Sequence, residues 1–257
     1  GSAVDSVGKD GAITIQEAKS NETSLELTEG FRFDSGLLAN AFVTDERRGV
    51  MKFEDCLILV TDRAITTIDE ILPTLELAAR DGRALIIVAE DISGQALAAM
   101  IMNAMKGSMK VAGIKAPRYG EERRNILSDL AISVGGTFLS RDSGIPLTGV
   151  KMENFGYAQT VESNKFSTTI VGGDQDDEKV EERIEALKLE IEQEPSISLC
   201  EKIQERITRL ASAVAIIKVG GLTEVEMIER KHRVEDALEA VNSARQEGIL
   251  TGGSSAL

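Results

Sequence analysis

The stretch between residues 56 and 140 alternates between short, wholly apolar runs and longer amphipathic segments. Uninterrupted apolar runs are typical of parallel strands that are buried on both faces, and amphipathic segments between them are typical of crossover helices. The pattern predicts parallel strands over residues 56–60, 84–89, 111–114 and 137–139. It predicts helices from just after Thr67 to just before Gly82, over residues 94–106 and over residues 121–134. Right-handed crossovers would place these helices on the faces of one sheet.

The remaining chain predicts a hairpin and three more helices. Residues 157–161 and 168–171 flank Asn164 and Lys165, which is typical of a hairpin. The further helices are expected over residues 174–194, 196–210 and 223–247, with Pro195 ending the first and Gly248 ending the last. Short strands are expected over residues 12–15, 24–27 and 214–219. The predicted class is α/β: a central domain with parallel strands and a hairpin, inserted into a mostly helical domain.

Composition narrows the function classes. The 257 residues carry a formal net charge of −14, which has the wrong sign for binding a phosphate backbone. The only cysteines, Cys56 and Cys200, are far apart in the sequence and fit neither a disulfide framework nor a zinc motif. No apolar run approaches the roughly 18 residues that a membrane helix needs. We therefore expect a cytoplasmic protein that binds neither nucleic acid nor membrane, and we expect this chain to be a fragment.

One acidic constellation is a candidate enzyme site. Asp62, Glu90 and Asp91 follow the first two predicted strands, and Lys115 follows the third. Carboxyl ends of parallel strands are where open α/β sheets bind ligands, so these residues could hold magnesium for phosphotransfer. The alternative is structural: Asp91 and Ser93 would cap the next helix and Lys115 would neutralise Glu90. The single histidine, His232, lies among charged helix residues and is expected to be solvated.

The helix predicted over residues 94–106 is unusually apolar. Its apolar side chains cover roughly 240° of the helix circumference, whereas packing on a sheet needs a stripe only a little over 100° wide. Four of the seven methionines, Met100, Met102, Met105 and Met109, fall here or just after it. Either a second layer buries this helix on both sides, or its outer side stays open as a flexible binding surface.

The preceding helix adds a second apolar stripe. Ile68, Leu72, Leu75 and Ala79 recur at helical spacing, most simply as the core face of that helix. If the outer edge of this stripe stays open beside the next helix, the two helices would form a groove for an apolar segment of another chain.

Several motifs resemble those of the group I chaperonin (GroEL-like) family. They lie at residues 29–34 (EGFRFD), 87–91 (IVAED), 111–117 (VAGIKAP), 213–220 (AVAIIKVG), 223–227 (TEVEM) and 233–238 (RVEDAL). The resemblance covers nearly the whole chain in order. It implies an apical polypeptide-binding domain over residues 30–213, with parts of the intermediate domain over 1–29 and over 214–257, where the equatorial segment would begin.

The resemblance implies a molecular chaperone. Non-native polypeptides, and a co-chaperonin loop if one is used, would bind an apical groove, and ATP-driven rotation of the domain in the ring would release them. The implied polypeptide-binding residues are Leu37, Leu38, Ala39, Ala41, Phe42, Leu72, Leu75, Leu97, Ile101 and Met102. The extended segment departs from the family, because only Phe42 keeps an aromatic side chain there.

The resemblance also assigns nucleotide, hinge and inter-subunit positions. Asp236 would assist ATP hydrolysis in the full-length protein, and Gly252 and Gly253 would begin a glycine loop against the nucleotide. ATP and magnesium are therefore implied cofactors, although this fragment should hydrolyse no ATP and should be a monomer. Without the family motif, Asp236 would be interpreted as an ordinary exposed carboxylate on a helix.

The sequence departs from the family at positions that the resemblance assigns to hinges between domains and to contacts between subunits. Gly30 and Gly248 match hinge positions, but Ser212 and Ala213 replace a glycine pair. Glu224 is kept, while Ser35 stands where an arginine normally pairs with it between subunits. These changes indicate a divergent member, for which a phage origin is one hypothesis. Two other functions stay open: the magnesium enzyme, and a scaffold whose apolar helix is covered by a partner subunit.

Overall fold

The computed structural model describes residues 12–255, with side chains described for residues 13–241. The chain divides into two compact units, a larger one over residues 29–213 and a smaller one formed by residues 1–28 together with 214–257. None of the described helices is both long enough and apolar enough to cross a membrane.

The centre of the larger unit is the predicted parallel sheet. Its strands are β3 (Met51–Thr61), β5 (Ala84–Ala89), β7 (Val111–Lys115) and the short β8 (Phe138–Leu139). Strand β5 pairs in parallel with both β3 and β7, and β8 pairs in parallel with the end of β3. Every residue of β5 is buried, which explains its uninterrupted apolar sequence. The prediction of parallel strands is confirmed.

The other half of this sheet is antiparallel. Strand β9 (Gly156–Ser163) pairs with β3, and β10 (Thr168–Gly173) pairs with β9 and with the end of β2 (Ser24–Phe33). The predicted hairpin is therefore confirmed, but the sheet is mixed rather than purely parallel. The hairpin joins the central sheet because inward-facing residues of β9, such as Ala158 and Val161, are buried in the same core.

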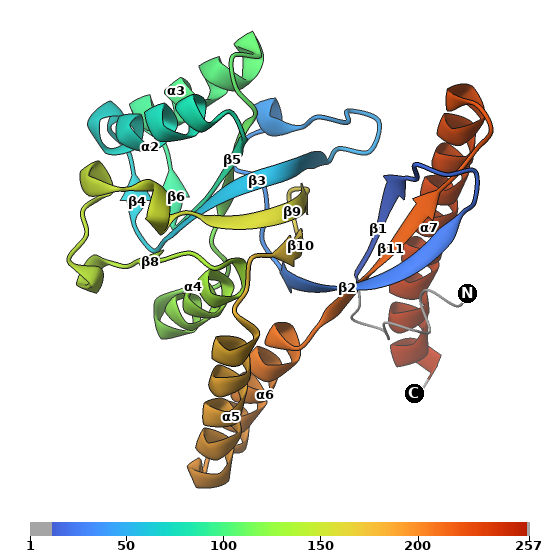
Figure 1. The fold of residues 1–257 in the computed structure, drawn as a ribbon. Helices are drawn as coiled ribbons and strands as arrows, with labels where there is room; N and C mark the ends of the chain where they lie inside the picture. Colours follow the sequence, from blue (N-terminus) through green and yellow to red (C-terminus); the bar gives the residue numbers. More distant parts are fainter. Residues whose placement is uncertain (1–11, 256–257) are drawn as a thin grey trace. The chain divides into compact units, whose positions relative to one another are not determined.

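The helices cover both faces of the sheet. Helices α2 (Ile68–Asp81) and α3 (Gly94–Lys106) lie on one face, and α4 (Gly120–Val134) lies on the other (Figure 1). This follows from right-handed crossovers, since the chain steps one way from β3 to β5 to β7 and then returns through α4 to β8 beside β3. Short 3₁₀ turns lie in the connections between strands: η1 (Asn40–Phe42) between β2 and β3, and η2 (Arg141–Ser143), η3 (Leu147–Gly149) and η4 (Met152–Asn154) between β8 and β9.

A helical hairpin packs on α4. Helices α5 (Asp177–Gln193) and α6 (Ile197–Leu210), both expected from the sequence, run side by side (Figure 1). The carboxylate of Asp129 on α4 is wholly buried and binds Arg183 of α5 at 2.7 Å. It also binds Arg206 of α6 at 2.8 Å. Burial lowers the pKa of Arg206, but its bonds to Asp129 outweigh this effect and raise the pKa above its ordinary value.

The smaller unit contains a parallel strand pair and one long helix. Strand β1 (Ala12–Glu17) pairs with β11 (Ala213–Val219), and α7 (Glu224–Ser255) packs against β1. The expected end of this helix at Gly248 is wrong, because α7 continues to Ser255. One internal glycine costs a helix only about 1 kcal/mol, so a glycine outside a left-handed cap does not stop it.

Candidate functional site

Helices α2 and α3 begin side by side because a small parallel sheet ties their starting points together. Its strands are β4 (Ala64–Ile65) and β6 (Asp91–Ile92). The amide of Ser93 donates to Ile65 O at 2.9 Å, and the amide of Ala96 donates to Thr66 O at 3.2 Å. Gly94 has a φ of +57°, and a Cβ there would lie 3.2 Å from Thr66 O, so this close approach requires glycine.

A capping box formed by Thr67 and Glu70 closes the first turn of α2. The amide and the hydroxyl of Thr67 donate to Glu70 Oε1 at 3.1 and 2.9 Å. These bonds favour the ionised carboxylate and lower the pKa of Glu70 below its ordinary value of 4.5. The capped turn fixes where α2 begins.

The core face of α2 differs from the predicted stripe. Its buried residues are Ile71, Thr74, Leu75 and Ala78. Of the predicted stripe only Leu75 is buried, whereas Ile68 is 37% exposed, Leu72 is 43% exposed and Ala79 is also exposed. The core face of α2 is thus rotated about the helix axis relative to the predicted stripe. It includes the fully buried Thr74, which a search for apolar residues does not find.

Helix α3 divides its wide apolar circumference between core and solvent. Ala96 and Met100 are buried, and Leu97 and Ile101 are half-buried against the core. Met102 is 54% exposed and Met105 is 76% exposed. The alternative in which this helix is buried on both sides by its own chain is wrong for the part of the chain that the structure describes.

An extended segment runs beside β7 and ends at the turn η1. Leu38 N donates to Gly113 O at 3.0 Å, and Lys115 N donates to Gly36 O at 2.9 Å. The bare backbone of Gly113 makes room, since a Cβ there would lie 3.4 Å from Leu38 Cδ1 and 3.1 Å from Ile92 Cδ1. The following turn η1 contacts both α3 and β7.

The predicted polypeptide-binding residues therefore differ in exposure. On the extended segment, Leu37, Leu38 and Ala39 are half-buried, Ala41 is exposed and Phe42 is buried. Phe42 and Leu75 belong to the core and can only support a binding surface from beneath. Met105 and Ile68 were not among the predicted binding residues, although both are more than a third exposed. We call Ile68, Leu72, Met102 and Met105, with the half-buried Leu97 and Ile101, the α2–α3 surface.

This surface can bind apolar side chains from water. Exposed apolar side chains gathered on neighbouring elements are unusual in monomeric proteins and mark interaction sites. Helices α2 and α3 contact each other, so their exposed side chains lie on adjoining elements. The methionines add adaptability, because an unbranched thioether can repack against ligands of different shape.

The acidic constellation does not form a metal site. Glu90 pairs with Arg141 at 3.2 Å and with Arg123 at 3.7 Å, so cations of the chain already balance its charge. Asp62 Oδ1 accepts from the Arg141 amide at 3.1 Å. Among the described residues, no three acidic, histidine or cysteine side chains are placed to share a metal ion.

The structural alternative for these residues is only partly right. Lys115 Nζ donates to the backbone oxygen of Glu90 at 3.2 Å, so arginines rather than Lys115 neutralise that carboxylate. Ser93 is the N-cap residue of α3, but its side chain makes no capping bond. Asp91 lies in β6, directly before this turn.

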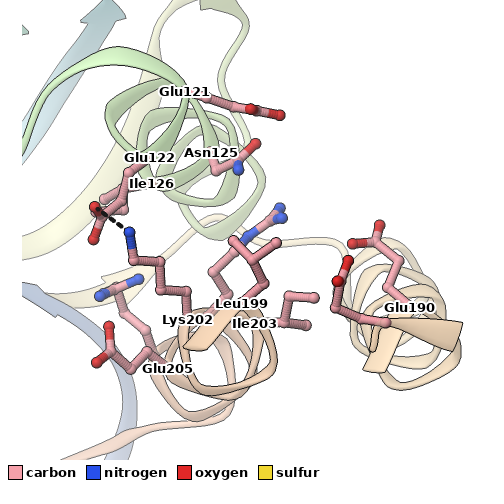
Figure 2. A pocket seen from close by; sticks show the side chains of 12 residues that line it. Glu121, Glu122, Asn125, Ile126, Glu190, Leu199, Lys202, Ile203 and Glu205 are labelled. Atoms are coloured by element: carbon pink, nitrogen blue, oxygen red, sulfur yellow. Dashed lines mark ion pairs between the residues drawn. The ribbon is translucent and has the colours of Figure 1, made fainter. Parts of the chain in front are cut away.

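Two hollows lie away from the α2–α3 surface. One, of about 410 Å³, is lined by Arg63, Glu70, Arg141, Gly144, Pro146, Leu147 and Thr148. The other, of about 300 Å³, lies between α4 and the α5–α6 hairpin. Figure 2 shows the lining side chains of α4 (Glu121, Glu122, Asn125) and of α6 (Leu199, Lys202, Ile203). Of these, Glu122 reaches toward α6, where it pairs with Lys202 Nζ at 3.6 Å. Neither hollow contains a predicted polypeptide-binding residue.

The predicted nucleotide residues lie on α7. Asp236 is exposed, and Gly252 and Gly253 are helical rather than part of a loop. At 1.5 Å of rise per residue, Asp236 and Gly252 lie about 24 Å apart along the helix. Residues this far apart on one helix cannot both contact the same phosphate group. His232 is exposed on the same helix, as predicted.

The predicted hinge and inter-subunit residues are placed as follows. Gly30 lies in β2, where its amide donates to Ser212 O at 3.3 Å, and Ala213 begins β11. Gly248 lies within α7, and the exposed Glu224 is the first residue of that helix. The carbonyl oxygen of Ser35 accepts a bond from the Thr168 hydroxyl at 2.7 Å.

Comparison with known proteins matches the chain to a protein family and to individual relatives. Residues 4–257 match the model of the TCP-1/cpn60 chaperonin family. The chain is 46% identical over 255 residues to a protein named Chaperonin GroEL 1 from Synechococcus sp. (strain CC9605), and this match covers 99% of the chain and 46% of that relative. The chain thus spans just under half the length of the relative, and the match lends no support to a phage origin. Together the two matches show that the chain belongs to the TCP-1/cpn60 chaperonin family, as a group I chaperonin.

Proposed function

We propose that this chain is the substrate-capturing part of a molecular chaperone. Non-native polypeptides bind the α2–α3 surface through their apolar side chains, and ATP-driven rotation in the full-length ring releases them. The observation that carries this proposal is the exposure of Leu72, Met102 and Met105 on adjoining helices. Family membership supports it, since these helices are those that the resemblance assigns to client capture.

The strength of capture follows from burial of apolar area. Each apolar contact contributes about 25 cal/mol per Å² removed from water, so one shallow surface binds weakly. Several copies in a ring would bind one unfolded chain together and raise the overall affinity through effective concentration. The half-buried Leu37 and Leu38 and the exposed Ala41 would add an aliphatic border to the surface.

The domain and partner assignments are part of the same proposal. Residues 30–213 would be the apical domain, and residues 1–29 and 214–257 would belong to the intermediate domain. A co-chaperonin loop, where one is used, would compete for the α2–α3 surface. The full-length protein would be cytoplasmic and form a homo-oligomeric ring that uses ATP and magnesium, with Asp236 assisting hydrolysis.

Serine substitutions on the α2–α3 surface test the proposal. Leu72→Ser and Met102→Ser should each weaken suppression of the aggregation of a denatured client by about fivefold, because losing roughly 40 Å² of apolar contact changes binding by about 1 kcal/mol. Both side chains are largely exposed, so far-UV circular dichroism and the urea midpoint should stay unchanged. Leu97 and Ile101 are less suitable, because serine there would also remove core contacts.

Leu189→Ser is the matched control, since Leu189 is 58% exposed but lies on α5. It should suppress aggregation as well as the unmodified chain does. Equal suppression by all three variants would show that the α2–α3 surface does not capture clients.

A further inference from the structure

Residues Gly30 and Ser212 meet where the chain passes between the two units. The boundaries of the larger unit fall before Glu29 and after Ala213, so both residues lie just inside it. The amide of Gly30 donates to the Ser212 backbone oxygen at 3.3 Å. The Ser212 hydroxyl donates in return to the Gly30 backbone oxygen at 3.0 Å. The two crossing segments are thus bonded to each other by one residue pair.

These two bonds hold both peptide planes that flank Gly30. The amide bond fixes the plane before its Cα, and the hydroxyl bond fixes the plane after it. Glycine adopts a wider range of φ and ψ than any other residue, so an unrestrained glycine at a crossing would let the segment turn freely. Gly30 also lies opposite Val171 in the ladder between β2 and β10. Ser212 adds one bond to each of the two peptide planes of Gly30, and only the second of these bonds depends on the Ser212 side chain.

The neighbouring contact supports the same segments. The guanidinium of Arg209, near the end of α6, lies 6.0 Å from the ring centre of Phe31, the residue after Gly30. Burial lowers the pKa of Arg209, and its Nη1 has no hydrogen-bond partner among the residues that the structure describes. Arg209 thus makes a cation–π contact between the end of α6 and β2. The hydroxyl of Ser212, three residues later, adds a directional bond to Gly30.

The hydroxyl of Ser212 also makes a local contact within its own segment, which must be distinguished from its bond to Gly30. Its hydroxyl also lies 2.9 Å from the backbone oxygen of Arg209. Serine near a helix end commonly donates to the residue three or four positions before it, and a single hydroxyl proton is shared between the two carbonyls. Such a helix-end bond would stabilise only the last turn of α6.

We propose that Ser212 is a positioning residue whose hydroxyl clamps the two crossings together and limits how freely the larger unit turns on them. Alanine at this position would keep the backbone bond and release the second peptide plane of Gly30. Threonine would keep the hydroxyl. The consequence for client release rests on the proposed function, whereas the clamp itself does not.

Amide hydrogen exchange and ¹⁵N relaxation of the 257-residue chain test the clamp. In Ser212→Ala the Gly30 amide should exchange about fivefold faster, the change expected for losing one ordinary hydrogen bond. The rotational correlation times of the two units should also differ more from each other than in the unmodified chain. In Ser212→Thr the exchange rate of the Gly30 amide should stay within about twofold of that in the unmodified chain. In Ser212→Gly this rate should be higher than in the alanine variant, because glycine frees the backbone as well.

Two results would overturn the clamp. One is unchanged Gly30 exchange in Ser212→Ala. The other is faster exchange confined to Thr208 and Ala211, which would show that the hydroxyl serves α6 alone. Neither measurement involves a client polypeptide. The clamp can therefore fail while Leu72→Ser still weakens client capture, and the proposed function can fail while the clamp holds.

Discussion

The two cysteines lie in contrasting surroundings. Cys56 is wholly buried in β3, where its thiol donates to Phe53 O at 3.3 Å. Burial raises the pKa of Cys56 to about 12, so almost no thiolate forms there near neutral pH. Cys200 is half-buried at the start of α6, with its sulfur 3.4 Å from Glu194 O. Both are free thiols.

Thiol labelling should separate the two residues. At pH 8 an aromatic disulfide reagent should modify one thiol per native chain, and the second only after urea unfolds it, because the thiolate is the reacting form. Cys200→Ser should remove the fast reaction and leave the slow one. Fast labelling of two thiols in the native chain would show that β3 opens readily around Cys56.

Single residues show where sequence reasoning succeeds and where it stops. The excess apolar surface of α3 could be predicted, because its apolar residues exceed what one core contact needs, and Met102 is exposed accordingly. The rotation of α2 could not be predicted, because the polar Thr74 is wholly buried while Leu72 is exposed. The bond from the hydroxyl of Ser212 to Gly30 joins residues 182 positions apart and leaves no local signal in the sequence.

At the scale of elements, the first turn of α2 carries a pH-sensitive cap. The pKa of Glu70 is lower in the folded chain than its ordinary value of 4.5, so ionised Glu70 stabilises the fold. That contribution is fully present above pH 4.5 and is lost as the pH falls through the lowered pKa.

Glu70→Gln should therefore destabilise the chain at pH 6, with a difference from the unmodified chain that shrinks as the pH falls below 4.5. Urea unfolding at several pH values measures this difference. Glu76→Gln, which changes an exposed glutamate of the same helix, is the control and should show no such convergence. A difference that stays constant from pH 6 to pH 3 would contradict a role for the ionised cap.

Element types were predictable, but several ends were not. The bounds of β5 and α3 agree with the sequence prediction because apolar runs bounded by glycine or charged residues define them. Strands β2 and β3 extend well past their predicted bounds, since their outer residues are partly exposed and follow no apolar run. Helix α7 extends past Gly248 because a single glycine is a weak stop.

At the scale of the whole molecule, Asp129 joins three helices of the larger unit. Its carboxylate accepts bonds from Arg206 Nε and Nη2 at 2.8 and 2.9 Å, in addition to the bond from Arg183. Removing one member of a buried ion pair leaves uncompensated charge and costs about 3–5 kcal/mol.

Asp129→Asn should therefore lower the free energy of unfolding by about 3 kcal/mol, toward the lower end of that range because Arg183 keeps 29% of its side chain exposed. Equilibrium urea unfolding measures the change. Asp142→Asn, at an exposed position in η2, is the control and should change the free energy by less than about 0.5 kcal/mol. An unchanged free energy of unfolding in Asp129→Asn would show that the buried ion pairs of Asp129 contribute little to the stability of the larger unit.

The architecture of the larger unit was only half predictable. Short crossovers fix the order of β3, β5 and β7, because the chain must return through a helix to the neighbouring strand. The pairing of β9 with β3 joins segments about a hundred residues apart, and no turn or spacing in the sequence specifies it. Prediction of the candidate surface depended on the local apolar excess of α3 and on the family motifs.

The short backbone run from Gly36 to Leu38 has a further consequence for the proposed capture of polypeptides. Strand β7 is the last strand of its sheet, and an unpaired last strand invites foreign strands to add to it. The run occupies the polar groups of Gly113 and Lys115, so the end of β7 is already taken by the protein itself. Under the proposed function, a polypeptide bound nearby would be held by its side chains, and its release would not require breaking a shared β-sheet.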